Sequence, residues 1–454
     1  MAPEAQTQAE RFDPASFSAF RFVSCELGLD GEIVLRYALD DAVYFEERVT
    51  VPVPDEVAPE RWEAARSLTG LLHLVAGVSY FKTAAPRNLS LGVPGPSPAV
   101  ARLLDQLYSL GLGEFAYING LEGVPEVAFP ADGPAAPVVL PPSTAALVPV
   151  GGGKDSVVAF EAMRAHGTQP TLFSVGDPAP IRETARVSGF ARLVATRRVS
   201  PNLPGLNDSG ALNGHVPVTA IVSCIAAVTA VLNGCGRIVM ANERSASEGN
   251  FAWRGAQVNH QWSKGLEAER LLQEALAELV PGLEYFSLLR GASELAIARS
   301  FARLPAYHGE FTSCNSVFRI DEERRGAGWC GRCPKCRFVY LALAPFMGRD
   351  ALRAVFGRDL LDEAEHYDGF AALAGVEAHK PFECVGETEE AVAAFRMLAA
   401  QPEWSRAAIV ARFASEVLAS LGPGVGDPAR VLELSGEHAV PQDLLPAVHA
   451  ALGA

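Results

Sequence analysis

Three glycines, a lysine, an aspartate and a serine follow one another from Gly151 to Ser156. Glycines let a backbone approach an anion without a Cβ in the way, and free N–H groups at the start of a helix attract phosphate. Ser156 adds a hydroxyl donor, Lys154 a countercharge and Asp155 a ligand for the Mg²⁺ that accompanies a polyphosphate. The run therefore predicts a polyphosphate-binding loop, and the alternative is a plain glycine turn between a strand and a helix.

This run resembles the S-G-G-x-D-S loop of the PP-loop ATP pyrophosphatases, which cut ATP between the α- and β-phosphates and pass AMP to a substrate oxygen. It is not a Walker A loop, because the G-x-x-x-x-G-K-[ST] spacing is absent. Gly151 replaces the first serine of the PP-loop pattern, so the backbone must supply more of the binding. The resemblance implies the following nucleotide-binding residues: Gly151, Gly152, Gly153, Lys154, Asp155 and Ser156 in the loop, and Phe173, Ser174 and Val175 along the adenine and ribose.

Strand and helix patterns alternate from residue 145 onward. The order predicts an α/β fold with a doubly wound parallel sheet, in which ligands bind outside the carboxyl ends of the strands. The glycine loop and the residues at 174–177 and 242–245 would then face one crevice. The expected strands are 145–150, 170–175, 192–196 and 237–241, and the expected helices are 155–166, 180–190 and 216–232.

The length of 454 residues suits about three domains. Residues 1–140 are predicted to form an N-terminal α+β domain, in which strands 17–25 and 32–38 make a hairpin. Residues 141–345 are predicted as the ATP-binding domain, with a proline-rich linker before it. Residues 346–454 have the periodicity of a mostly helical C-terminal region.

The formal net charge of −15 disfavours nucleic acid, because binding to phosphate needs a basic surface. The apolar run 216–232 carries Thr219, Ser223 and Thr229 and lacks basic flanks, so it is predicted to be a buried helix and not a membrane span. The first ten residues lack the features of a secretory signal. These patterns favour a cytoplasmic enzyme with small-molecule ligands and no membrane partner, and they leave the oligomeric state undetermined.

A long polar and aromatic loop runs from the expected strand end at residue 241 to Lys264. Loops of this length are usually functional, so it is predicted to bind substrate, the alternative being an ordered surface excursion. His215 precedes the helix 216–232, whose dipole favours a neutral imidazole that can act as a base; a loop histidine without a role is the alternative. The candidate substrate contacts are Asn242, Arg244, Arg254, Asn259 and Lys264.

Cysteines mark two further segments. Cys330, Cys333 and Cys336 have C-x-x-C-x-x-C spacing, and with Cys314 they form a ligand set for Zn²⁺ or an iron–sulfur centre; free thiols or one catalytic thiol are the alternatives. The segment resembles the zinc knuckle of PP-loop enzymes that make 7-cyano-7-deazaguanine, and structural zinc is the favoured ligand. Cys384 stands apart, and its default interpretation is a core cysteine, with a catalytic role left open by its polar neighbours.

Taken in order, the motifs resemble those of one family over nearly the full length, the MurL-type epimerases of UDP-N-acetylmuramoyl-L-alanyl-L-glutamate. The resemblance implies an ATP- and Mg²⁺-dependent isomerase that inverts the terminal L-Glu of this peptidoglycan precursor. The matching segments are Phe20 to Phe22, Gly151 to Ser156, Asn213 to Pro217, Ala241 to Glu243, Val258 to Gln261, Cys330 to Cys336 and Lys380 to Gly386.

The chemistry implied by this resemblance is adenylation of the substrate carboxylate, which cancels its charge and makes Cα more acidic. A base then removes the proton, an acid returns it on the other face, and water releases AMP. Lys154 and Mg²⁺ on Asp155 would stabilise the departing pyrophosphate. The candidates for proton transfer are Cys384, His215, His260 and Glu243. The alternatives are another PP-loop ligase or amidase and a nucleotide-binding module without turnover.

Overall fold

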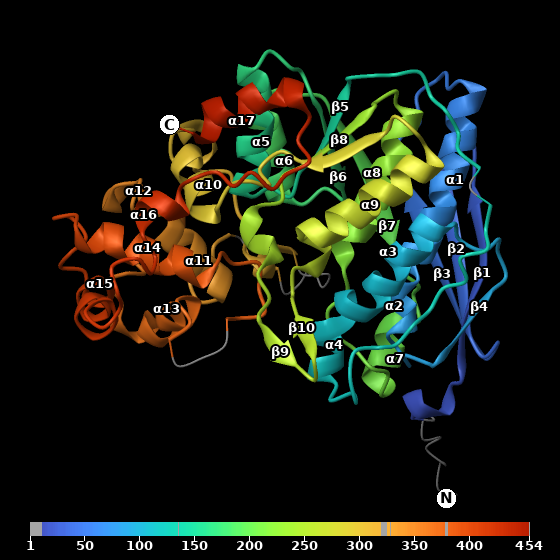
Figure 1. Cartoon of the computed structure of the whole chain (residues 1–454), viewed down its shortest axis with the longest axis horizontal. Coiled ribbons are helices and arrows are strands. Elements are labelled where there is room, and N and C mark those ends of the chain that lie inside the picture. The colour runs from blue at the N-terminus through green and yellow to red at the C-terminus, as the bar shows by residue number, and fades with distance from the viewer. Residues whose placement is uncertain (1–10, 135, 319–324, 327, 377–379, 454) are drawn as a thin grey trace, which may run out of the picture.

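The computed structural model describes residues 11–134, 136–318, 325–326, 328–376 and 380–453 (Figure 1). Within these residues one mixed sheet has the strand order β11-β8-β5-β6-β7-β3-β2-β1-β4, and β9 and β10 form a separate hairpin. The strands are β1 (Ala19–Leu27), β2 (Glu32–Leu39), β3 (Val43–Thr50), β4 (Asn88–Leu91), β5 (Ala146–Pro149), β6 (Thr171–Val175), β7 (Arg192–Arg198), β8 (Arg237–Met240), β9 (Phe251–Trp253), β10 (Ala256–Val258) and β11 (Glu284–Ser287).

The half of the sheet from β11 to β7 is parallel and covered on both faces, as the sequence predicts. Successive residues of its strands point to opposite cores: Leu147 packs with α1 and α8, and Val148 packs with α5 and α10. The four predicted strands and three predicted helices are confirmed, and their ends differ by only a few residues. The fifth parallel strand, β11, was not predicted.

Helices follow the strands and make up the C-terminal region. The earlier helices are α1 (Pro59–Ala76), α2 (Val78–Phe81), α3 (Pro98–Ser109), α4 (Gly113–Ile118), α5 (Lys154–Ala165), α6 (Ala179–Ser188), α7 (Leu203–Ser209), α8 (Val218–Leu232), α9 (Leu266–Leu279) and α10 (Glu294–Phe301). The later helices are α11 (Pro334–Leu343), α12 (Arg349–Phe356), α13 (Tyr367–Leu373), α14 (Thr388–Ala399), α15 (Ala408–Phe413), α16 (Pro428–Val431) and α17 (Leu445–Leu452).

The N-terminal strands extend the same sheet, because β3 pairs antiparallel with β7 at Thr50 and Thr196. One face of this antiparallel half buries aromatic side chains such as Phe22 and Tyr37 under α1 and α3. The other face carries ion pairs, among them Arg36 with Glu26 at 2.6 Å. An antiparallel sheet tolerates water on one face, whereas the parallel half needs cover on both.

The helical C-terminal region packs against α10 and α5, on the side of the parallel strands away from the N-terminal sheet (Figure 1). Its core includes the fully buried Trp404. The apolar helix α8 lies under α1, inside the hydrophobic core that also contains Leu147, as expected for a buried helix. Among the described residues no helix has the length and apolarity needed to cross a membrane.

Candidate active site

The glycine loop connects β5 to α5 at the carboxyl end of the parallel sheet. Gly152 has a φ of 75°, and a Cβ there would come within 2.9 Å of the backbone nitrogen of Ile181. Only glycine fits this left-handed, crowded position without strain. Gly153 is the N-cap of α5, and around Gly151 a Cβ would meet nothing within 4 Å. The loop therefore has open space at its tip and a helix N-terminus behind it.

Three carboxylates surround the start of α5. Asp155, Glu243 and Glu294 each bring an oxygen to a point where all three lie within 4.8 Å of one another. Lys154 is buried and pairs with both Asp155 and Glu294. Oxygen ligands of this kind are the ones Mg²⁺ prefers, so the residues present fit the metal that accompanies a polyphosphate.

The pKa of Asp155 shows how many charges meet here. Burial raises this pKa, but the nearby positive charges of Lys154, Lys335 and Lys264 outweigh burial and lower it below its ordinary value. Lys264 lies on the long polar loop, and Lys335 lies in the cysteine segment at the start of α11. Side chains from three separate parts of the chain thus act on one carboxylate.

Glu294 was missed by the sequence analysis. It begins α10, just after β11, and Ser293 caps this helix by accepting a hydrogen bond from the Ala296 N–H at 3.1 Å. Because β11 was not predicted, Glu294 was not recognised as a residue that follows the carboxyl end of a parallel strand. The signal available in the sequence was Ser293 followed by Glu294 after the short apolar run 285–289.

Cys384 lies beside this carboxylate cluster. Its Sγ is 3.5 Å from the Nζ of Lys264. Burial raises the pKa of the Cys384 thiol, but the charges of Lys264 and Lys335 and a hydrogen bond from His260 outweigh burial, and the pKa falls well below its ordinary value. These neighbours therefore favour the thiolate form of Cys384, the form in which a cysteine can act as a base or a nucleophile.

The two candidate histidines are neighbours with opposite properties. The rings of His215 and His260 lie 4.3 Å apart between centroids. Burial lowers the pKa of His260, but hydrogen bonds to Cys384 and Glu114 outweigh burial and raise it to about 9. Burial and the charge of His260 lower the pKa of His215 to about 4. At neutral pH one ring is charged and the other is neutral.

Lys264 connects the two clusters. Its ammonium interacts with Cys384 and also with Glu243 and Asp155, and together these charges raise the pKa of Lys264 above its ordinary value against the opposing effect of burial. Four residues proposed for catalysis or binding from separate sequence motifs therefore lie around one point: Asp155, Glu243, Lys264 and Cys384.

Other candidate residues lie elsewhere or have structural partners. The side chain of Asn259 donates to the Ala246 carbonyl at 3.0 Å and accepts from the Gln261 N–H at 2.8 Å, so it shapes its own loop. Arg254 is exposed at the tip of the β9–β10 hairpin, where it donates to the Glu122 carbonyl at 2.5 Å.

The segment 173–175 ends β6 beside the glycine loop. Phe173 is fully buried in the core, and its carbonyl accepts a hydrogen bond from the Val150 N–H at 2.8 Å. The hydroxyl of Ser174 donates to the Gly176 carbonyl at 2.9 Å. Only the backbone of this strand end and Val175, which is half-buried, remain for contact with a ligand.

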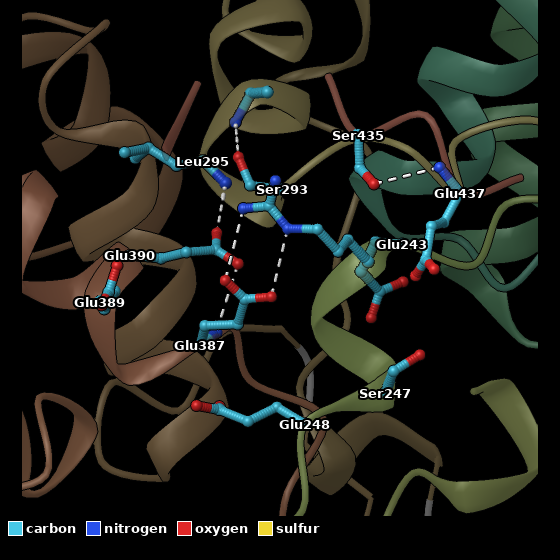
Figure 2. A network of polar contacts seen from close by, with 12 residues as sticks. Glu243, Ser247, Glu248, Ser293, Leu295, Glu387, Glu389, Glu390, Ser435 and Glu437 are labelled. Carbon is cyan, nitrogen blue, oxygen red and sulfur yellow. Dashed lines mark hydrogen bonds and ion pairs between the residues drawn. The ribbon is translucent and has the colours of Figure 1, made fainter. Parts of the chain in front are cut away.

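Arg244 belongs to a supporting network that joins the loop after β8 to the C-terminal region. Its guanidinium pairs with both carboxylate oxygens of Glu387, at 3.2 and 3.3 Å. Figure 2 shows Glu387 and Glu390 at the start of α14, where Glu390 also accepts from the Leu295 N–H at 2.7 Å. Because Leu295 follows Glu294, this contact holds the start of α10 and its site carboxylate in place. Asn242, next to Glu243, is buried.

The four cysteines of the predicted metal site come together. Cys314, Cys330, Cys333 and Cys336 all have sulfur atoms within 4.8 Å of one another. The closest pairs are 3.4, 3.6 and 4.0 Å apart, and the edge of a tetrahedral Zn–S₄ site is about 3.8 Å. Backbone N–H groups of Cys333 and Cys336 point at the preceding sulfurs at 3.4 Å. The cluster is therefore compatible with a structural zinc ion.

The architecture and the site define an α/β protein with carboxylates and a lysine at the carboxyl ends of parallel strands and a cysteine beside them. The chain matches the model of the MurL N-terminal domain over residues 11–288 and that of the MurL C-terminal domain over residues 310–423. The chain belongs to the MurL family. No solved structure matches it.

Three relatives cover most of the chain, and each is named UDP-N-acetyl-alpha-D-muramoyl-L-alanyl-L-glutamate epimerase. The protein of Salinispora tropica is 48% identical over 89% of this chain and 88% of its own, and that of a Micromonospora species is 48% identical over 86% and 89%. The protein of Xanthomonas oryzae pv. oryzae is 43% identical over 97% and 98%. The family predicted from the sequence is thereby confirmed.

Proposed function

We propose that this protein epimerises the terminal L-Glu of UDP-N-acetylmuramoyl-L-alanyl-L-glutamate to D-Glu and that ATP drives the reaction through an acyl-adenylate. The names of its relatives support the epimerase activity. The observation that carries the mechanism is the junction of a glycine loop and three carboxylates with the Cys384 thiolate, all connected by Lys264.

The first step is attack of the substrate carboxylate on the α-phosphorus of ATP. The bond between the α-phosphorus and the bridging oxygen breaks, and pyrophosphate leaves. The N–H groups at the start of α5 and the ammonium of Lys154 stabilise the phosphates, in the manner of a PP-loop ATP pyrophosphatase. Asp155, Glu243 and Glu294 would hold Mg²⁺, which would neutralise phosphate charge.

The second step is proton transfer at Cα. Adenylation removes the negative charge of the carboxylate, so the carbanion no longer forms beside an anion. The Cys384 thiolate lies next to Lys264, which also acts on Asp155 and Glu243, and it takes the proton on one face of Cα. Return of a proton to the other face, followed by attack of water on the acyl carbon, releases the D-Glu product and AMP.

The cysteine cluster has a structural part in this proposal. Cys314, Cys330, Cys333 and Cys336 would hold zinc, which would fix the start of α11, and Lys335 lies between two of these ligands. The charge of Lys335 lowers the pKa of both Asp155 and Cys384. The cysteine cluster would therefore keep this cation near both groups without taking part in the reaction.

Exchange of labelled pyrophosphate into ATP tests the adenylation step by itself. We expect exchange that needs both Mg²⁺ and the L-Glu-terminated substrate. Exchange of the same rate without the substrate would contradict an acyl-adenylate. The matched control is the precursor that ends at L-Ala. It lacks the terminal L-Glu, so its carboxylate cannot reach the position that the Glu carboxylate occupies.

A further inference from the structure

Glu114, on α4 of the N-terminal region, has no role in the sequence analysis or in the reaction described above. Its carboxylate pairs with Nδ1 of His260, and only 14% of its side chain and 15% of that of His260 are exposed. The ring of His260 also hydrogen-bonds to Cys384. A sulfur, an imidazole and a carboxylate thus follow one another in a line of contacts.

We propose that Glu114 is a positioning residue that holds His260 as an imidazolium against the Cys384 thiolate. This is the arrangement of an activated cysteine, in which the third group orients the ring and stabilises its charge. Glu114 acts through His260 and touches neither the sulfur nor the substrate. Its catalytic consequence rests on the function proposed above, whereas its effect on the thiolate does not.

The packing of α4 shows why Glu114 can reach this ring. A Cβ on Gly113 would lie 3.7 Å from Cα of Val258, two residues before His260. A Cβ on Gly111 would lie 3.3 Å from the ring of Trp262, and one on Gly214 would lie 3.3 Å from the ring of Phe115. The lack of a side chain at Gly111 and Gly214, where the contacts are tight, allows the segment around α4 to pack closely against the segments that carry both histidines.

The ring of His260 interacts with both Glu114 and Cys384, which bears on whether it could bind a metal ion. Glu114, His215 and His260 bring donor atoms within 4.8 Å of one another, which is a spacing that a metal ion accepts. Nδ1 of His260, however, is paired with Glu114, and the ring also interacts with Cys384, so His260 already has partners within the protein. The arrangement therefore fits an ion-paired triad better than a metal site.

The charged groups that face the pair come from several elements. Lys264 and Lys335 favour the thiolate, while Glu383 lies on the same segment and interacts unfavourably with it. His215 lies against His260 and has its own pKa lowered to about 4, so it carries no charge at neutral pH. The carboxylate of Glu114 pairs with Nδ1 of His260.

The sign of the expected effect follows from these contacts. Without the charge of Glu114, the pKa of His260 falls, the imidazolium is lost at lower pH, and the Cys384 thiolate loses a favourable neighbour. The thiolate–imidazolium pair then persists only to a lower pH, because it needs His260 in its charged form. A fall of one unit in the pKa of His260 moves the upper pH limit of the charged pair down by about one unit.

The test is the rate at which iodoacetamide alkylates Cys384 in the zinc-replete full-length protein, followed between pH 5 and 9 by mass spectrometry of the Cys384 peptide. We expect Glu114→Gln to lower, by about one unit, the pH at which this rate changes as His260 loses its proton. Glu122→Gln, at an exposed position on the turn after α4, is the matched control and should follow the wild type.

A Glu114→Gln profile that superimposes on the wild type would overturn the proposal. If that variant does not fold, Glu114→Asp keeps the charge but shortens the side chain, and we expect a downward shift smaller than one unit; a wild-type profile would again contradict the proposal. Because alkylation needs no ATP and no turnover, a failure of the proposed epimerase function leaves this result unaffected.

Discussion

The two halves of the candidate active site hold opposite charges by opposite means. In the glycine-loop half, the cation Lys154 is enclosed by the carboxylates Asp155 and Glu294. In the thiolate half, the anion Cys384 is enclosed by the cations Lys264 and His260. The first arrangement suits a metal-bound polyphosphate, and the second suits removal of a proton from carbon.

The halves also differ in how the fold builds them. The glycine-loop half stands on the ends of β5, β8 and β11 in a parallel sheet, so strand order alone brings its residues together. The thiolate half stands on α4, the loop that contains Lys264 and the segment 380–386, which no sheet connects. If the halves serve successive steps, changes in each should affect a different step.

Asp155→Ala should have the largest effect, in the glycine-loop half. It removes one of three candidate metal ligands and leaves Lys154 with a single carboxylate partner. We expect loss of pyrophosphate exchange by about 10³-fold or more, since charge stabilisation of a leaving phosphate is lost. Circular dichroism should show an intact fold, and the exposed Asp55→Ala is the control. Exchange at the wild-type rate would remove Asp155 from the metal site.

Cys384→Ser should separate the halves. A serine hydroxyl stays protonated at neutral pH, so deuterium uptake at Cα and inversion should fall by about 10²- to 10⁴-fold while pyrophosphate exchange continues. Cys25→Ser, in β1 and half-buried, is the matched control. Normal inversion by Cys384→Ser would exclude this thiol as a proton carrier, and loss of both activities would mean that the halves are not separable.

Disruption of the cysteine cluster should impair both halves of the site, because the charge of Lys335 lowers the pKa of Asp155 in one half and of Cys384 in the other. We expect one zinc per chain by elemental analysis, and we expect Cys333→Ala to lose it together with exchange and inversion. Its thermal unfolding temperature should also fall, since a bound metal stabilises the folded state. Iron with a visible absorption band would contradict the zinc assignment, and a metal-free wild-type protein with full activity would contradict a structural role.

Glu390→Gln should have the smallest effect, on stability only. Burial and the charge of Glu387 raise the pKa of Glu390 to about 8. Because this folded-state pKa lies above the ordinary 4.5, the stability that the protonated group contributes is complete below pH 4.5 and is lost as the pH rises toward 8.

Glutamine carries no charge at any pH, so it removes this dependence. We expect the free energy of unfolding of Glu390→Gln, relative to wild type, to rise by on the order of 4 kcal/mol between pH 5 and 8.5 in urea titrations. Glu389→Gln, with a more exposed side chain on the same turn, should show no such trend. Parallel pH profiles for Glu390→Gln and wild type would contradict a neutral Glu390.

The sequence predicts the glycine-loop half well, because strand periodicity and glycine spacing are local signals. The strands around β5 and the turn at Gly152 follow from them, and the four cysteines meet as their spacing indicates. Glu294 was missed only because the short strand β11 carries a weak signal.

The thiolate half could not be derived in the same way. Cys384 and His260 were candidates by their polar surroundings, but nothing local relates Glu114 to either, since 146 residues separate Glu114 from His260. Lys335 was seen only as part of a metal-binding spacing. Tertiary packing alone brings Glu114 to His260 and Lys335 to the site. Asn259 and Arg254 were predicted to bind substrate from the same kind of polar sequence, but their side chains hydrogen-bond to backbone groups instead.

The most direct test of the account is one incubation in D₂O with ATP, Mg²⁺ and UDP-N-acetylmuramoyl-L-alanyl-L-glutamate, following pyrophosphate, the chirality of the glutamate and its deuterium content. We expect pyrophosphate release that depends on the substrate, with D-Glu carrying deuterium at Cα. D-Glu that retains its original proton, or inversion without ATP, from folded and zinc-replete protein would contradict the proposed mechanism.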